Sequence, residues 1–162
     1  MTAVAKLTPT RFVGKFAASG FRFNAMNESG MKAELGSTPA ETLAGFRTQL
    51  DRTTYLPGGV EMLVGDMVIH SQDIRRPLQI SHTFPPDALT LVADSVIRSN
   101  LVLGGKRRAT GPKLTATDQD WTAGAGPEVK GPLASIIIVV TGRKDRLLDL
   151  SGDGVAVLTS RV

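Results

Sequence analysis

Hydrophobic residues recur at helical spacing through the first hundred or so positions of the chain. Residues Thr8 to about Ala25 carry Phe12 and Phe16 on one side, which predicts a helix, although two internal glycines weaken that pattern. A loop or short helix is expected from Asn27 to Leu35. The pattern therefore favours a helical first half.

The stretch STPAETLAGFRTQL has a clear helix start. Thr38 is placed as the N-cap, Pro39 occupies the first helical position, and Glu41 lies three residues after the cap. The apolar residues that follow predict one buried stripe on this helix, made of Leu43, Phe46 and Leu50.

Two further helices are expected before residue 104. One runs from about Val60 to Arg76, where Pro77 discourages continuation, and the other is entered through Pro85 and Pro86. A helical wheel of the first of these helices and its continuation places seven apolar residues in one arc: Val60, Leu63, Val64, Met67, Val68, Ile74 and Leu78.

Beyond Gly104 the pattern changes. KLTATD alternates like a strand, whereas LASIIIVVTG is a continuous apolar run that fits either a buried helix or a buried strand. A helix entered at Pro132 is favoured. Trp121 is expected to be structural, and SGDG is interpreted as a helix start capped by Ser151 or Asp153. The predicted fold is mainly α, with a helical bundle over residues 1–104 and a small α+β segment over 105–162.

Composition restricts the chemistry. The chain has 162 residues, a formal net charge of +4 and no cysteine, so a disulfide framework, a thiolate metal site and a cysteine nucleophile are excluded. Acidic and basic residues are interspersed, and no apolar run is long enough to span a bilayer. We therefore expect a soluble cytoplasmic protein with neither nucleic acid nor membrane as a partner.

One helix edge carries candidate chemistry. Asp66, His70 and Asp73 fall within an arc of roughly 60° beside the apolar stripe. Asp66 and His70 are four residues apart, so a carboxylate oxygen and an imidazole nitrogen could hold one divalent cation. An ordinary pair of a surface aspartate and a histidine fits the same spacing.

Basic residues near this edge also allow two interpretations. Arg75 and Arg76 would complement the dipole at a solvated helix end, or bind a carboxylate of a cofactor or substrate. The same two interpretations apply to Lys106, Arg107 and Arg108.

Three stretches together resemble a known family. GDMVIHSQDIRRPLQI, NLVLGGKRRATGPKLTATDQDWTAGAGPEVKGP and TGRKDRLLDLSGDGVAVL resemble the mycothiol-dependent maleylpyruvate isomerase family of actinobacterial DinB-like proteins. The resemblance implies a four-helix bundle that binds a divalent metal, usually zinc. The ligands implied are one histidine on an early helix and an acid-x-x-x-His pair, which corresponds to Asp66 and His70.

The chain departs from the family pattern at two places. Asp66 stands where the family often has glutamate, and the early helix with its metal-binding histidine has no counterpart. The only other histidine, His82, lies in an expected loop and is interpreted as an ordinary loop residue. The beginning MTAVAKLTPTRFVG resembles the continuation of that absent helix, so the chain is expected to be a truncated member in which Met1 is internal.

The resemblance implies mycothiol and a metal ion as cofactors, in a thiol-assisted isomerase or a thiol transferase acting on an electrophilic substrate. The alternative is a helical binding module that lacks a complete metal site and has no catalytic activity. Loss of one bundle helix would expose apolar stripes, so a homodimer or a tendency to aggregate is expected.

Overall fold

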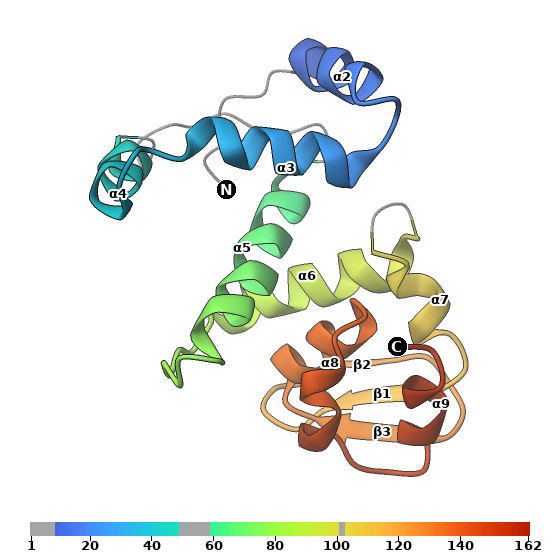
Figure 1. The fold of residues 1–162 in the computed structure, drawn as a ribbon. Coiled ribbons are helices and arrows are strands. Elements are labelled where there is room, and N and C mark those ends of the chain that lie inside the picture. Colours follow the sequence, from blue (N-terminus) through green and yellow to red (C-terminus); the bar gives the residue numbers. More distant parts are fainter. Residues whose placement is uncertain (1–8, 49–58, 101–102) are drawn as a thin grey trace. The chain divides into compact units, whose positions relative to one another are not determined.

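A computed structural model describes residues 9–48, 59–100 and 103–162 (Figure 1). The chain divides into two compact units, an N-terminal unit of Met1–Leu63 and a C-terminal unit of Val64–Val162. The described residues are mainly helical, with one small sheet, as the sequence predicts. None of the helices within the described ranges is both long and apolar enough to cross a membrane.

The N-terminal unit contains helices α2 (Pro9–Ala18), α3 (Phe23–Glu34) and α4 (Pro39–Arg47). The single helix expected over residues 8–25 is wrong, because Gly20 and Phe21 adopt positive φ angles of 63° and 59° and end α2. The ring of Phe21 then packs edge-on against that of Phe16, with centroids 5.5 Å apart. Helix α3 then begins at Phe23, so the segment from Asn27, expected as a loop or short helix, is helical and its helix starts earlier than expected.

The start of α4 confirms the capping prediction. The side chain of Thr38 accepts a hydrogen bond from the Glu41 backbone N–H at 3.2 Å, and the Glu41 carboxylate accepts one from the Ser37 N–H at 2.8 Å. The predicted buried stripe is wrong for Leu43 and Phe46, which are 46% and 37% exposed. Leu50 lies outside the described residues.

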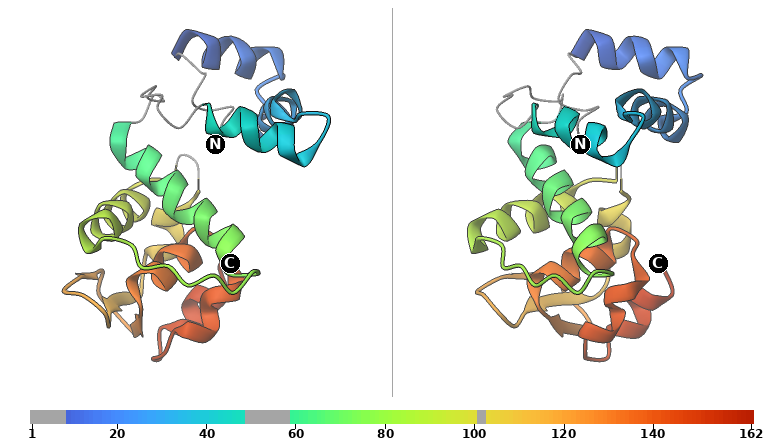
Figure 2. Two further views of the ribbon diagram at one scale, coloured as in Figure 1. Left: turned by 90° about the vertical axis from the view of Figure 1, so that its left-hand side faces the viewer. Right: turned by 60° about the vertical axis from the view of Figure 1, so that its left-hand side comes forward.

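Helix α5 (Gly59–Arg75) and helix α6 (Pro86–Arg98) confirm the two further predicted helices (Figure 2). The buried face of α5 is formed by Gly65, Val68 and Ile69, and Gly65 lies against Val92 of α6. The predicted apolar arc is therefore only partly right, because Val60, Met67, Ile74 and Leu78 are exposed.

The small sheet has the strand order β2-β1-β3. Strand β1 (Lys113–Ala116) pairs antiparallel with β2 (Thr122–Ala123) and parallel with β3 (Glu128–Gly131). Alternate residues of β1 and β3 are buried on one face, as expected for strands with one covered side. The predicted strand in KLTATD is confirmed.

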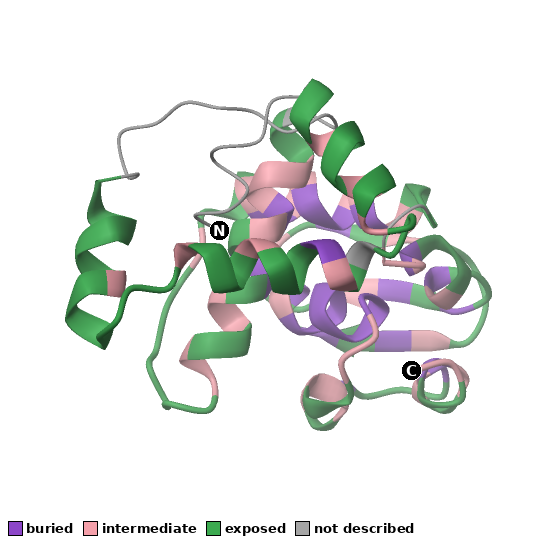
Figure 3. Ribbon diagram, turned by 45° about the horizontal axis from the view of Figure 1, so that its top comes forward, coloured by how far each residue is buried: buried purple, intermediate pink, exposed green. Residues whose placement is uncertain are grey.

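The core of the C-terminal unit is built around α8 (Leu133–Val140), which confirms the helix predicted to enter at Pro132 (Figure 3). Nearly every residue of this helix is buried, including Ile136 to Val140. A helix that is apolar on all sides needs cover on all sides. That cover comes from α6, from β1, from helix α7 (Gly105–Ala109) and from the 3₁₀ helix η1 (Lys144–Asp149).

Trp121 and the last helix complete this unit. The Trp121 indole is 8% exposed and its Nε1–H donates to Asp94 of α6 at 3.0 Å, so it ties the sheet to that helix. Helix α9 (Val155–Thr159) starts at Gly154 without a side-chain cap, so the predicted capping by Ser151 or Asp153 is wrong. Ser151 instead exchanges backbone hydrogen bonds with Lys130, both at 2.8 Å.

The division of the chain differs from the predicted boundary at residue 104. Helix α6 and most of α5 belong to the same compact unit as residues 105–162. The reason is the apolar helix α8, which needs more cover than a small appendage can supply and takes it from α6.

Candidate functional site

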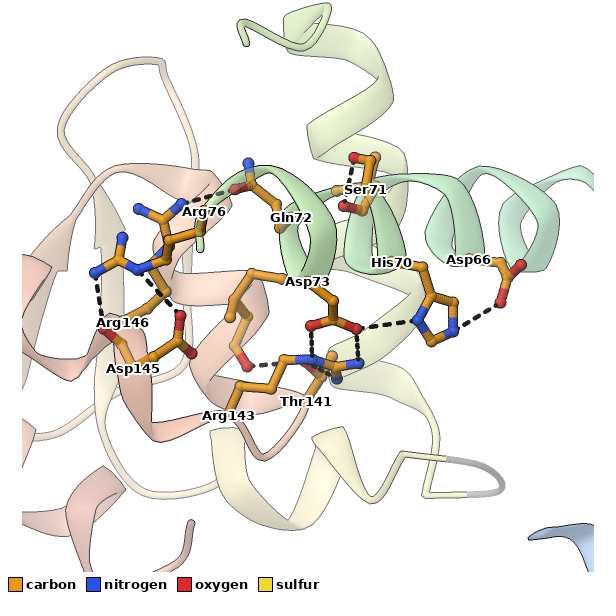
Figure 4. A network of polar contacts seen from close by, with 12 residues as sticks. Asp66, His70, Ser71, Gln72, Asp73, Arg76, Thr141, Arg143, Asp145 and Arg146 are labelled. Carbon is orange, nitrogen blue, oxygen red and sulfur yellow. Dashed lines mark hydrogen bonds and ion pairs between the residues drawn. The ribbon is translucent and has the colours of Figure 1, made fainter. Parts of the chain in front are cut away.

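Three side chains on successive turns of α5 form a row of polar contacts within the C-terminal unit (Figure 4). The His70 Nε2 atom lies 3.2 Å from Asp66 Oδ1, and the His70 Nδ1 atom lies 3.0 Å from Asp73 Oδ2. The spacings of four and three residues place these side chains on one face of the helix. The imidazole is thus held at both nitrogens by carboxylates, and its side chain remains 52% exposed.

Arg143, in the turn after α8, anchors this row. Its Nε and Nη2 atoms contact the two carboxylate oxygens of Asp73 at 2.6 and 2.7 Å, a bidentate pair. Its Nη1 atom also donates to the Thr141 hydroxyl at 3.2 Å. The hydrogen bond from Arg143 is the main cause that lowers the pKa of Asp73; its charge and the hydrogen bond with His70 add to it, against the opposing effect of burial.

The order Arg143, Asp73, His70, Asp66 has a chemical consequence. A carboxylate that accepts from one ring nitrogen of a histidine fixes its tautomer and leaves the other nitrogen as a lone-pair donor. Here Asp73 would hold the proton on Nδ1, so that Nε2 presents its lone pair beside the Asp66 carboxylate. Metal-binding histidines are commonly supported in this way.

The spacing of the two donors fits a divalent cation. Zinc–ligand distances near 2.0–2.1 Å at a tetrahedral angle place neighbouring donor atoms about 3.3 Å apart. The 3.2 Å between Asp66 Oδ1 and His70 Nε2 is close to that value. Among the described residues, however, no group of three or more histidine, aspartate and glutamate side chains is arranged so that all of them could hold one metal ion. The donor set of the described residues therefore fits part of a metal site.

A second polar cluster lies further along α5 and ties it to η1. Asp149 accepts from Arg146 Nη1 and from Ser135 Oγ, both at 2.8 Å, and forms a longer contact of 3.4 Å with Arg76. Burial opposes ionisation of Asp149, but hydrogen bonds from Arg146 and Ser135, with the charges of Arg146 and Arg76, outweigh burial and lower its pKa. Gln72 Oε1 accepts from Arg146 Nη2 at 2.7 Å, which closes the cluster.

The structure separates the basic residues that the sequence grouped. The Arg76 guanidinium contacts Asp145 at 3.1 Å and Asp149, so its donors have protein partners. The Arg75 side chain makes no hydrogen bond or ion pair with another described residue. Arg108 donates to the carbonyls of Leu103, Val140 and Arg161, which leaves it committed to the fold.

His82 lies in an exposed loop, as the sequence predicts. Its ring packs edge-on against Phe84, with centroids 4.6 Å apart. That contact is ordinary for a loop histidine and brings no carboxylate close to it among the described residues.

Arg143 is the residue that sequence reasoning missed. It lies 70 positions from Asp73, so helical spacing could not place it. The signal that could have found it is TGRKDR, in which a glycine turn directly after the buried helix is followed by four charged residues. Gly142 has a φ of 100°, and this turn brings Arg143 back toward α5.

Comparisons with family models, with curated proteins and with solved structures find no match to this chain.

Proposed function

We propose that this chain is a mycothiol-dependent metalloprotein of the maleylpyruvate isomerase type with a DinB-like helical bundle, acting as a thiol-assisted isomerase or thiol transferase. The observation that carries the proposal is the row on α5, in which His70 Nε2 and Asp66 Oδ1 lie 3.2 Å apart while Asp73 supports the other ring nitrogen. The resemblance of three sequence stretches to that family supports the same conclusion.

Each residue of the row has a distinct role in this proposal. His70 and Asp66 would provide two ligands to a divalent cation, Asp73 would orient the imidazole, and Arg143 would hold Asp73. When bound, a divalent cation with an open coordination position lowers the pKa of a thiol and so supplies a thiolate at neutral pH. The chain has no cysteine, so the thiol would come from a cofactor.

Calorimetric titration with zinc tests the metal part of this proposal. We expect the unaltered chain to bind zinc, and His70→Ala to lose most of that binding because it removes one of two donors. Asp73→Asn should weaken binding by roughly 10- to 100-fold, the usual effect of changing a residue that supports a ligand. His82→Ala is the matched control, because it removes the other histidine, and should bind zinc as the unaltered chain does.

A second candidate is a helical binding module without catalysis. The observation that favours it is that both nitrogens of His70 have carboxylate partners, because an imidazole with a proton on each nitrogen would satisfy the row without a metal. Under this reading, zinc would bind no more tightly to the unaltered chain than to His70→Ala. Equal binding by the two chains would reject the metalloprotein proposal and favour the binding module.

A further inference from the structure

An open pocket of about 670 Å³ lies in the C-terminal unit, where α7 meets the end of the chain. Figure 1 shows the C-terminus beside α7. The volume is within the range of pockets that hold small molecules. Six polar residues line it: Asn100, Lys106, Arg107, Thr110, Ser160 and Arg161.

The charge of this pocket is uncompensated. Three of its lining residues are cationic and none is acidic. Lys106 and Arg107 are exposed, and their side chains make no hydrogen bond or ion pair with any described residue. Other basic residues of the same unit do pair with carboxylates, namely Arg76, Arg98, Lys113, Lys130, Arg143 and Arg146. The pocket is therefore a place where anion-binding groups are left free.

Hydrogen bonds connect the two chain segments that line the pocket, one at α7 and one at the end of the chain. The Arg161 guanidinium donates to the backbone carbonyls of Arg107, Arg108 and Thr110, with the first two contacts at 3.3 and 3.2 Å. Arg108 Nε returns a bond to the Arg161 carbonyl at 3.2 Å. The Asn100 side chain accepts from the Arg107 N–H at 2.8 Å. These bonds fix the backbone that carries Lys106 and Arg107, so less conformational entropy of this segment is lost when a ligand binds.

The two hydroxyl groups in the pocket can only accept further hydrogen bonds. The Thr110 hydroxyl donates to the Lys106 carbonyl at 2.7 Å, and the Ser160 hydroxyl donates to the Val157 carbonyl at 2.8 Å. A hydroxyl has one hydrogen and two lone pairs, so both oxygens retain acceptor capacity. A ligand that uses these two oxygens must therefore bring hydrogen-bond donors of its own. An inorganic anion has few such donors, whereas a molecule with several hydroxyl groups has many.

We propose that this pocket binds a small hydroxylated anion of the sugar phosphate class. Lys106 and Arg107 contact the phosphate through charge-assisted hydrogen bonds, and the hydroxyls of the sugar donate to Thr110 and Ser160. This site is separate from the row on α5 and does not depend on the function proposed for it.

Calorimetric titration with glucose 6-phosphate, inorganic phosphate and glucose tests this assignment. We expect glucose 6-phosphate to bind more tightly than inorganic phosphate, and glucose not to bind measurably. The double variant Lys106→Gln/Arg107→Gln should bind glucose 6-phosphate at least about tenfold more weakly, since it loses two charge-assisted contacts. Circular dichroism would check that the variant keeps its helical content.

A matched control removes the same charge elsewhere. Lys15 and Lys144 are exposed and do not line the pocket, so Lys15→Gln/Lys144→Gln should leave binding within about twofold of the unaltered chain. Equal weakening in both double variants would overturn the proposal, because it would reflect overall charge alone. Glucose 6-phosphate binding no tighter than inorganic phosphate would overturn it as well, because the hydroxyl contacts would then contribute nothing.

Discussion

Replacing Arg143 with glutamine should raise the pKa of Asp73 toward its ordinary value of 3.8 and should weaken the C-terminal unit. The reason is the bidentate contact at 2.6 and 2.7 Å, which favours the ionised carboxylate. The two side chains are 25% and 38% exposed, so solvent screens the pair. We therefore expect a coupling free energy of about 1 kcal/mol, at the upper end for exposed ion pairs.

The pH dependence of this coupling follows from the direction of the shift. The pKa of Asp73 is lower in the folded state than in the unfolded chain, so ionised Asp73 contributes its stabilisation above the unfolded value of about 3.9. That contribution is lost as the pH falls below this value and through the folded pKa. The coupling should therefore be complete at pH 6–7 and should decline only below about pH 4.

Two measurements check this prediction. Carboxyl ¹³C NMR gives the titration midpoint of Asp73 in the unaltered chain and in Arg143→Gln. Urea unfolding of Arg143→Gln, Asp73→Asn and the double variant at pH 7 gives the coupling from a double-mutant cycle. A midpoint for Asp73 that does not move on replacing Arg143, together with additive single effects, would refute the role given to this pair.

Other parts of the structure give predictions of their own. Trp121→Phe should lower the free energy of unfolding by roughly 0.5–1.5 kcal/mol through loss of the hydrogen bond to Asp94, measured by urea unfolding. Ile137→Ala should cost about 2–5 kcal/mol because Ile137 is fully buried, whereas Leu148→Ala, at a residue that is 94% exposed, should change stability by less than about 0.5 kcal/mol. The N-terminal unit exposes Phe21, Leu35 and Leu43, so sedimentation at micromolar concentrations should show self-association, and a stable monomer would contradict this.

Local signals in the sequence predicted much of the secondary structure. Thr38 and Glu41 mark a helix start because their side chains cap neighbouring backbone groups, and that chemistry lies within four residues. Pro132 likewise marks the start of α8, where it can fill a position that needs no backbone N–H. The break after α2 was missed because Phe21 adopts a positive φ angle that its residue type seldom takes.

Tertiary contacts were predicted less well. The helical wheel placed Met67, Ile74 and Val68 in one apolar arc, although of these three only Val68 is buried. Which side of a helix is covered depends on its neighbours, and here Val92 of α6 lies against the side of α5 that carries Gly65. In the candidate site, the contact between Asp66 and His70 follows from their spacing of four residues. The contact of Asp73 with Arg143 does not, because it joins segments 70 residues apart.

The proposed function depends on His70 Nε2 as a metal donor and on Asp73 as the group that supports Nδ1. The most direct test is ¹⁵N NMR of the histidine side chains during titration with zinc. We expect the His70 Nε2 resonance to shift on zinc addition, Nδ1 to keep its proton, and the His82 resonances to stay unchanged. If zinc leaves the His70 Nε2 resonance unaffected, or shifts the His82 resonances to the same extent, His70 is not the metal donor.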